Sequence, residues 1–392
     1  MDDLAPQEAA VLDQISRNPF AGQQEIADAL GIARSTVAAH VVQLIKKGYI
    51  LGRGYVLPTS GQVLCIGGAV FDRKYRALQP LVAETSNPVE AFHSFGGVAR
   101  NVVENLARLG EPVGFVSILG DDQTGHHILG HLRDQGVDVS RVIIAPDATT
   151  AEYGAILTPA GELALGIADM AIFDRLTPAA LSRVWSHVAG AAWVFADANL
   201  PAETLAALIR RHEGGRYQLT IDGVSTHKIR KLPADLSGID LLFMNADEAA
   251  ALLDLPVARD LPEALDAARA AVARGAKRAQ VSMGAQGLAI AGDGYELVIP
   301  AVPAASVDIT GAGDAMVAGT LHALVSGHDF PTAARTGALM GALTVETPGT
   351  VRADLGREML ETHARSRLTA PSAAAPAPEL TTPTTPTTPA TA

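Results

Sequence analysis

The sequence has a single cysteine, few aromatic residues and no long hydrophobic run, and each shortage excludes a class of protein. Cys65 has no partner for an intrachain disulfide and cannot build a zinc site of several cysteines, so a reducing compartment is expected. No apolar run approaches the ~18 residues that cross a bilayer. Met1-Asp2-Asp3 is acidic where a secretory signal would be basic. These shortages predict a cytoplasmic protein that does not enter a membrane.

The composition predicts a large buried core. Charged residues make up 18% of the 392 positions and hydrophobic residues 48%, with a mean hydropathy of +0.20, which is too apolar for a disordered protein. The net charge of −12 argues against a surface that binds nucleic acid throughout. The length suggests two or three domains, or one large unit with appendages.

Composition divides the chain into three zones. Residues 1–58 are rich in helix formers, residues 59–368 alternate short apolar runs with longer amphipathic ones, and residues 369–392 form a Pro/Thr/Ala-rich tail predicted to be disordered. In the middle zone, strands are predicted at Val63–Ile66, Val113–Ile118, Ala192–Ala196, Leu219–Asp222, Leu241–Met244, Gln280–Met283 and Leu288–Ala291. Helices are predicted at Val98–Leu109, Pro178–Val188, Ala202–Arg211, Leu261–Arg274 and Ala312–Val325.

This alternation predicts an α/β fold with a mostly parallel central sheet flanked by helices, because parallel strands need crossover connections. The segment from Thr150 to Leu176 alternates apolar and small residues and predicts a β-hairpin in a small lid.

The first zone predicts three short helices, at residues 8–17, 23–30 and 36–47, with Ser35 as a helix cap, followed by a small hairpin over residues 49–57. This pattern resembles a winged helix-turn-helix module, whose third helix would enter the major groove of DNA. No acid occurs from Ala29 to Pro58, so the third helix and hairpin are electropositive. The candidate DNA contacts are Arg34, Ser35, Thr36, His40, Lys46, Lys47 and Arg53. Because so few cations make few phosphate contacts, we expect the protein to bind DNA as a homodimer. The alternative to DNA binding is that this module serves in packing or dimerisation.

The segment from Asp308 to Asp314 reads Asp-Ile-Thr-Gly-Ala-Gly-Asp and precedes a helix of small residues. Glycines at a helix start let backbone N–H groups approach an anion, and the helix dipole adds to the attraction. Asp314 would lie beside that anion, where a carboxylate can accept the proton of a hydroxyl that attacks phosphorus. The alternative is an ordinary glycine-rich turn with an Asp in the first helical turn.

A second glycine pair, Gly96-Gly97, opens a predicted helix, and Asn101 follows one turn later. Paired glycines allow the hydroxyl groups of a ligand to approach the backbone closely. They are also a common way to pack a helix against a sheet, and this alternative stays open.

Two further segments follow predicted strands. Asn245 and Glu248 share one helix edge, a spacing that suits a hydrated Mg²⁺ ion with its phosphates and equally suits a capping box. The other segment is a glycine-rich turn that contains Ser282, Gly284 and Gly287, and it can pass close to a nucleotide.

Taken in this order, the four segments resemble those of the ribokinase or PfkB family of small-molecule kinases, over about Val63 to Leu368. The resemblance implies a ribokinase-like fold and the ATP-dependent phosphorylation of a sugar or nucleoside. By the same resemblance, Asp314 would be the catalytic base and the amides of Gly311, Ala312 and Gly313 the anion hole. The substrate hydroxyls would be bound by Asp72, Gly96, Gly97 and Asn101. The nucleotide would be bound by Asn245, Ser282, Gly284 and Gly287, Mg²⁺ by Glu248 through water, and K⁺ near Asp308 and Thr310.

Within the family, the segments GGVARNVVENLARLG, GELALGIADM, VSMGAQG and DITGAGDAMVAG look like those of the members that phosphorylate pseudouridine. This implies pseudouridine 5′-phosphate as the product, with Asp169 reaching the nucleoside from the lid; Asp169 as a solvated loop acid is the alternative. A kinase for ribose, fructose or an ordinary nucleoside stays open. So does a transcription regulator whose kinase-like domain senses a ligand.

Overall fold

Alternate residues of the central strands face two hydrophobic clusters, one on each side of a single sheet. The computed structural model describes residues 4–52, 61–212 and 216–368. In β1 (Val63–Ile66), Leu64 and Ile66 join one cluster, whereas Val63 and Cys65 join the other. Strands buried on both faces are typical of parallel sheets covered by helices.

The central sheet has eight strands in the order β14-β13-β12-β11-β10-β9-β1-β4. Strands from β12 to β4 in this order pair in parallel, and β13 and β14 are antiparallel additions at one edge. The strands beside β1 are β4 (Val113–Val116), β9 (Trp193–Asp197), β10 (Gln218–Asp222), β11 (Leu241–Asn245), β12 (Arg278–Ser282), β13 (Gly287–Gly292) and β14 (Tyr295–Pro300). The predicted mostly parallel sheet is confirmed.

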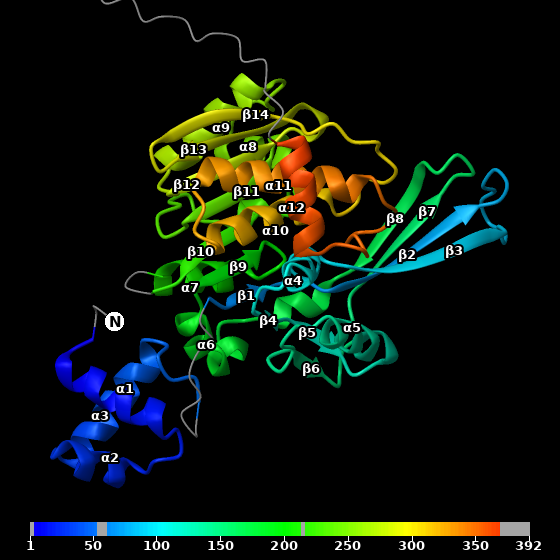
Figure 1. Ribbon diagram of the computed structural model, residues 1–392. Helices are drawn as coiled ribbons and strands as arrows, with labels where there is room; N and C mark the ends of the chain where they lie inside the picture. The colour runs from blue at the N-terminus through cyan, green and yellow to red at the C-terminus, as the bar shows by residue number, and fades with distance from the viewer. Residues whose placement is uncertain (1–3, 53–60, 213–215, 369–392) are drawn as a thin grey trace, which may run out of the picture.

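Helices cover both faces of this sheet (Figure 1). One cluster takes side chains from α6 (Trp185–Gly190), α7 (Ala202–His212), α8 (Ala246–Leu253) and α9 (Leu261–Ala273). The other takes them from α4 (Val98–Arg108), α5 (Gln123–Asp134), α10 (Ala312–Val325) and α11 (Phe330–Val345). The last helix, α12 (Arg357–Arg367), packs against α11.

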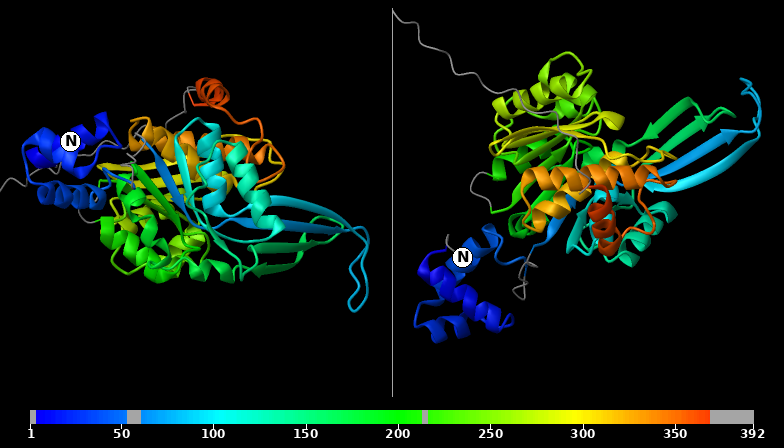
Figure 2. Two further views of the ribbon diagram at one scale, coloured as in Figure 1. Left: turned by 90° about the horizontal axis from the view of Figure 1, so that it is seen from below. Right: turned by 45° about the horizontal axis from the view of Figure 1, so that its top comes forward.

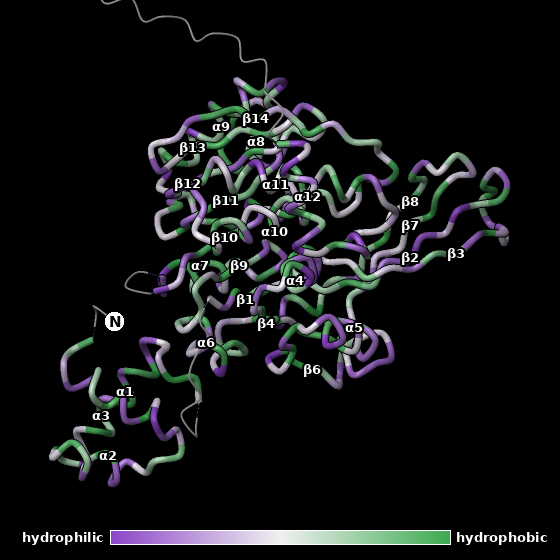
Figure 3. The backbone as a smooth tube through the Cα atoms, in the orientation of Figure 1, coloured by the Kyte–Doolittle hydropathy of each residue, from purple (hydrophilic) through white to green (hydrophobic). Residues whose placement is uncertain are grey.

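A second sheet forms the lid, with strand order β3-β2-β7-β8. Its strands are β2 (Val70–Ala77), β3 (Val89–Gly96), β7 (Glu152–Leu157) and β8 (Leu163–Asp169). Figures 1 and 2 show them projecting from the body, and Figure 3 shows more hydrophilic residues along β2 and β3 than along β7 and β8. The predicted hairpin is confirmed as β7 and β8, whereas β2 and β3 were not predicted. A small two-stranded sheet joins β5 (Ile118–Gly120) to β6 (Ile143–Ala145).

Two predicted elements differ from the structure. The run Val113–Ile118 divides into β4 and β5 at Ser117, whose hydroxyl donates to the carbonyl oxygen of Gly67 over 2.6 Å. The helix predicted at Pro178–Val188 is instead a 3₁₀ turn, η2 (Ala180–Arg183), followed by the short helix α6. Another 3₁₀ turn, η1 (Ala171–Arg175), joins the lid to this segment.

The N-terminal residues form three helices around their own small core. These are α1 (Pro6–Arg17), α2 (Gln23–Leu30) and α3 (Arg34–Lys46), which bury apolar side chains against one another. Ser35 was predicted to cap α3, but Ala33 is the cap, because the helix begins one residue before Ser35. Most of the predicted hairpin, including Arg53, lies outside the described residues, as does the tail. No helix in the described ranges is long and apolar enough to cross a membrane.

Candidate active site

Asp314 lies in the first turn of α10, which follows Gly311. Gly311 has a φ angle of +79°, which residues with a Cβ rarely adopt. A Cβ at this position would also overlap the carbonyl oxygen of Thr350, so glycine allows the segment before α12 to pack against the helix start. The amides of residues 311–313 therefore lie at the N-terminus of a 14-residue helix, where the anion hole was predicted. The Ala312 amide also donates to the Ile309 carbonyl oxygen over 3.3 Å.

Asn101 connects the second motif with Asp314. Its Nδ2 donates to Oδ2 of Asp314 over 2.6 Å, from α4 to the neighbouring α10. Burial raises the pKa of Asp314 to about 7, although the hydrogen bond from Asn101 and the charge of Arg100 act to lower this pKa. A carboxyl group with this pKa is matched to accepting a proton near neutral pH.

Arg100 is a site residue that the sequence analysis missed. Its buried guanidinium donates to Oε2 of Glu104 over 2.5 Å, to the Phe95 carbonyl oxygen over 2.7 Å and to Oγ1 of Thr350 over 3.1 Å. It also donates to Oδ1 of Asn101, so the Asn101 amide turns its Nδ2 toward the carboxylate of Asp314. The available signal was an arginine between the glycine pair and Asn101, four residues before Glu104.

Asp72 reaches the same site from β2 of the lid. A Cβ on Gly96 would overlap its carboxylate, so Asp72 lies directly against the glycine pair. Burial raises the pKa of Asp72 to about 6, and the charge of Arg100 opposes this rise. Gly97 has a φ angle of +93°, and a Cβ there would lie 2.5 Å from the carbonyl oxygen of Gly68. The structure therefore brings together Asp72, Gly96, Gly97, Asn101 and Asp314.

Asp197, at the end of β9, is a second residue that the sequence analysis missed. Its fully buried carboxylate accepts from the backbone amides of Gly68 over 2.9 Å, Ala99 over 3.0 Å and Asn199 over 3.0 Å. These bonds join the end of β9 to the turn after β1 and to the start of α4. Burial raises the pKa of Asp197. An acidic residue at the end of a buried strand was the signal that could have indicated it.

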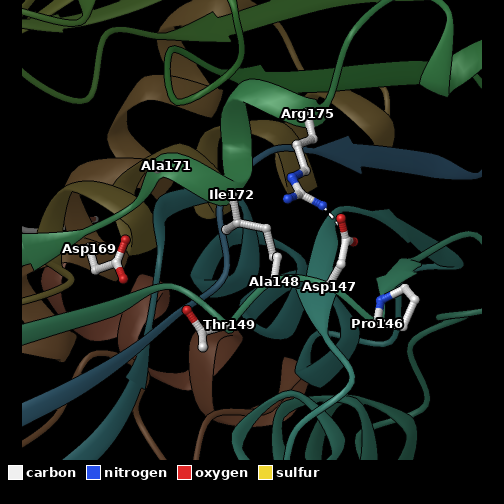
Figure 4. Close-up of a pocket in the computed structure, with 8 residues that line it drawn as sticks. All are labelled: Pro146, Asp147, Ala148, Thr149, Asp169, Ala171, Ile172 and Arg175. Carbon is white, nitrogen blue, oxygen red and sulfur yellow. Dashed lines mark hydrogen bonds and ion pairs between the residues drawn. The ribbon is translucent and has the colours of Figure 1, made fainter.

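Asp169 lies apart from this group. In the lid sheet Asp169 pairs with Glu152, and Glu152 pairs with Phe71, so these three side chains lie on one face of the sheet. Asp72 follows Phe71 in β2 and therefore lies on the opposite face. Asp169 lines a pocket of about 520 Å³ at the base of the lid (Figure 4). The other lining residues are Pro146, Asp147, Ala148, Thr149, Ala171, Ile172 and Arg175.

Asn245 and Glu248 form the capping box that was one of the two predicted alternatives. Oδ1 of Asn245 accepts from the Glu248 amide over 2.9 Å, and Oε2 of Glu248 accepts from the Asn245 amide over 3.0 Å. Nδ2 of Asn245 also donates to Oε1 of Glu248 over 2.8 Å. The box fixes both side chains at the carboxyl end of β11.

The residues around Glu248 fit a hydrated Mg²⁺ ion. A Cβ on Gly223 would lie 3.0 Å from Oε2 of Glu248, so this carboxylate faces the end of β10. Burial and the charges of Glu248 and Asp314 raise the pKa of Asp222, the last residue of β10. Among the described residues, no group of three His, Cys, Asp or Glu side chains can hold a metal. Magnesium ordinarily takes only one or two carboxylates from the protein, and phosphates and water supply its other ligands. Glu248 and Asp222 provide these carboxylates.

The predicted nucleotide turn lies beside the capping box, because Asn245 pairs with Ser282 across β11 and β12. Gly284 begins a 3₁₀ turn, and a Cβ there would meet open space. Gly287 has a φ angle of +122°, and a Cβ there would overlap the Ile299 carbonyl oxygen, so its conformation and the pairing of β13 with β14 both require glycine.

The predicted K⁺ residues interact with each other and with the lid. The hydroxyl of Thr310 donates to Oδ1 of Asp308 over 2.6 Å, and Nζ of Lys74 lies 3.6 Å from Oδ2. Burial would raise the pKa of Asp308, but the bonds from Thr310 outweigh burial and hold the pKa below its ordinary value.

The six predicted DNA contacts that the structure describes divide into two groups. Arg34, Ser35 and Lys46 are exposed on α3, and Thr36 is half-buried. The other two face α1: Nζ of Lys47 lies 2.7 Å from Oε2 of Glu8, and Nε2 of His40 lies 3.4 Å from Oε1 of Gln7.

Comparisons with known proteins agree with this geometry. Residues 60–355 match the family described as pfkB family carbohydrate kinase, and residues 7–50 match winged helix-turn-helix DNA-binding. An uncharacterized sugar kinase of Escherichia coli, YeiI, is 31% identical over 338 residues, covering 86% of this chain and 92% of that protein. A pseudouridine kinase of Escherichia coli is 30% identical over 277 residues, covering 70% and 87%.

Solved structures show the same fold. A carbohydrate kinase from Agrobacterium tumefaciens superposes with a TM-score of 0.69 at 31% identity, covering 77% of this chain and 96% of that chain. An Arabidopsis thaliana ribokinase, solved with ribose and ATP, superposes with a TM-score of 0.67 at 23% identity, covering 78% and 98%. The chain belongs to the PfkB family of carbohydrate kinases, phosphotransferases with an alcohol group as acceptor, and carries an N-terminal winged helix-turn-helix module.

Proposed function

We propose that this kinase transfers the γ-phosphoryl group of ATP to the 5′-hydroxyl of pseudouridine. The observation that carries the proposal is the half-buried Asp314 carboxylate, which accepts a hydrogen bond from Asn101 at the N-terminus of α10, close to Gly96 and Gly97. The 30% identical pseudouridine kinase supports the choice of substrate. ATP as donor, and the single buried Cys65, support action in the cytoplasm.

In the proposed transfer, Asp314 removes the proton of the 5′-hydroxyl as its oxygen attacks the γ-phosphorus. A new O5′–P bond forms, the bond from the γ-phosphorus to the bridging oxygen of ADP breaks, and the proton stays on Asp314. The amides at residues 311–313 stabilise the negative charge on the phosphoryl group in the transition state of its transfer. Asp72, Gly96, Gly97 and Asn101 orient the sugar, so binding energy is converted into alignment of the hydroxyl. Asp169, on the other face of the lid, has no part in these contacts.

The same proposal assigns the nucleotide to the carboxyl ends of β11 and β12. Asn245, Ser282, Gly284 and Gly287 would bind ATP, and Glu248, with Asp222 nearby, would hold the waters of Mg²⁺. When bound, the ion would neutralise charge on the phosphates. A K⁺ ion at Asp308 and Thr310 would have to share the carboxylate with Lys74.

A panel of acceptors tests the substrate. ADP release would be followed with pseudouridine, uridine, other nucleosides, ribose and fructose, each with ATP and Mg²⁺. The proposal expects the highest kcat/KM for pseudouridine. A higher kcat/KM for ribose or fructose would make the protein a sugar kinase instead.

We propose DNA binding as a second function, because α3 exposes one stripe of contact residues. Ser35, Ala39, Val42 and Lys46 follow one another at spacings of four and three residues, which places them on one side of the helix. Small apolar side chains suit the methyl group of thymine in the major groove, and Arg34 and Lys46 suit phosphates.

The few exposed cations support a homodimer that binds two half-sites. Light scattering measures the mass in solution, and selection from random DNA followed by titration at two salt concentrations tests binding. Ligand-dependent DNA binding without any ADP release would instead support a regulator that only senses the ligand.

A further inference from the structure

Lys228 is a partly buried cation that the proposed transfer does not use. It follows β10 and immediately precedes the 3₁₀ turn η3 (Ile229–Lys231). Its Nζ donates to Oδ1 of Asn199 over 2.5 Å and to Sδ of Met170 over 3.6 Å. Both partners are neutral, which is unusual for an ammonium group withdrawn from water.

Burial lowers the pKa of Lys228 below its ordinary value, and the charge of Asp197 acts in the opposite direction. The neighbouring Lys231 has backbone partners instead. Its Nζ donates to the carbonyl oxygens of Ala198, Asn199 and Leu200 over 3.1, 3.3 and 3.1 Å. Lys231 therefore stabilises the loop after β9 through the backbone. Lys228 contacts the same loop through the side chain of Asn199 instead of through the backbone.

The pair of Lys228 and Asn199 lies next to the sugar-binding glycines. Nδ2 of Asn199 would lie 2.8 Å from a Cβ on Gly68, and the carbonyl oxygen of Gly68 approaches Gly97. Met170 directly follows β8, so the base of the lid borders the pair on its other side. A group attached to a sugar in the active site would thus meet these side chains between the lid and the ends of β9 and β10.

We propose that Lys228 and Asn199 form a subsite for the base of the nucleoside, and that they recognise carbonyl oxygens of a pyrimidine. An ammonium group has three donors, of which Asn199 and Met170 take two, and the N–H₂ group of Asn199 has two donors, of which Asp197 takes one. Both side chains therefore present donors only, which match the two carbonyl oxygens of a uracil-type base. A sugar without a base cannot use them. This inference rests on the proposed nucleoside kinase activity.

Kinetics of the full chain with Lys228→Met test the subsite, and Lys231→Met is the matched control on the same loop. We expect kcat/KM for pseudouridine and for uridine to fall about 10- to 100-fold, mainly through KM, because a hydrogen bond from a charged donor is lost. The KM of ATP, and ribose measured as substrate or competitive inhibitor, should stay unchanged. Lys228→Arg should restore part of the nucleoside affinity, and Lys231→Met should not reproduce the selective loss.

The outcomes separate the two proposals. A wild type that phosphorylates sugars but no nucleoside overturns the proposed function and this subsite with it. If the wild type phosphorylates nucleosides, three results with Lys228→Met would overturn the subsite alone. The variant could have unchanged kinetics, it could lose affinity for ribose and nucleosides equally, or it could change only the KM of ATP.

Discussion

At the scale of single residues, the environment of Asp314 sets its chemistry. An exposed aspartate has a pKa near 4 and is a weak base at neutral pH. In the first turn of α10, burial raises the pKa of Asp314 to about 7, while Asn101 and Arg100 keep this pKa from rising further. The proton acceptor of the proposed reaction is therefore poised at the pH of the cell.

Asp314→Asn removes the proton acceptor while keeping the shape and the hydrogen-bonding capacity of the side chain. We expect kcat to fall about 10²- to 10⁴-fold, the usual contribution of a general base. Thermal unfolding should stay near that of the wild type, because Asn relieves a buried carboxyl of its desolvation cost. Near-normal turnover would reject Asp314 as the base.

The pH dependence follows from the same pKa. Only the deprotonated Asp314 accepts a proton, so kcat/KM should rise with pH through about 7 and then level off. Asn101→Ala removes the donor that stabilises the carboxylate, which raises the pKa of Asp314 and moves the rising limb to higher pH. Asn105→Ala is the control, because its Nδ2 donates to the Asn101 carbonyl oxygen and not to Asp314. A limb that does not move in Asn101→Ala would contradict the assignment.

At the scale of elements, the sequence predicted the parts that are buried on both faces. β1 was predicted to the residue, because four consecutive apolar side chains mark a strand covered by helices on both sides. β2 was missed because it reads VFDRKYRA, and only its two ends are buried, with five consecutive partly or fully exposed residues between them. Asp314 and Asn101 were predicted from their motifs. Asp197 was missed because the amides from which it accepts, those of Gly68 and Ala99, are far along the chain. Arg100 was missed although most of its hydrogen-bond partners are close in sequence.

At the start of α10, we expect a substitution of Gly311 to destabilise the protein and the same substitution of Gly313 to have little effect on stability. Gly311→Ala forces a Cβ into a left-handed conformation and against the Thr350 carbonyl oxygen, so we expect a loss of about 2 kcal/mol or more. In a domain of this size that lowers Tm by about 3 °C. Gly313→Ala is the matched control, because a Cβ there meets nothing within 4 Å. Calorimetry compares the two, and equal Tm values would show that the close approach to Thr350 carries no strain.

At the scale of the whole molecule, two modules of opposite character share one chain. The net charge of −12 belongs mainly to the kinase, whereas the stretch from Ala29 to Pro58 has no acidic residue. Figures 1 and 2 show α1–α3 and the lid at opposite ends of the molecule. The N-terminal module contacts α6, where Oγ of Ser186 donates to the Leu51 carbonyl oxygen over 3.2 Å.

Arg216 is a contact between the modules that can be removed by itself. Its guanidinium carbon lies 3.8 Å from the centre of the Tyr49 ring, an interaction worth about 0.5–2 kcal/mol. Arg216→Ala should therefore speed hydrogen exchange about 2- to 30-fold at residues 47–51, because local opening becomes easier, with kcat unchanged. Arg211→Ala is the control, since its guanidinium stacks on Trp185 at 4.3 Å within the kinase. It should leave exchange at residues 47–51 as in the wild type, and equal exchange in all three proteins would mean that Arg216 does not hold the modules together.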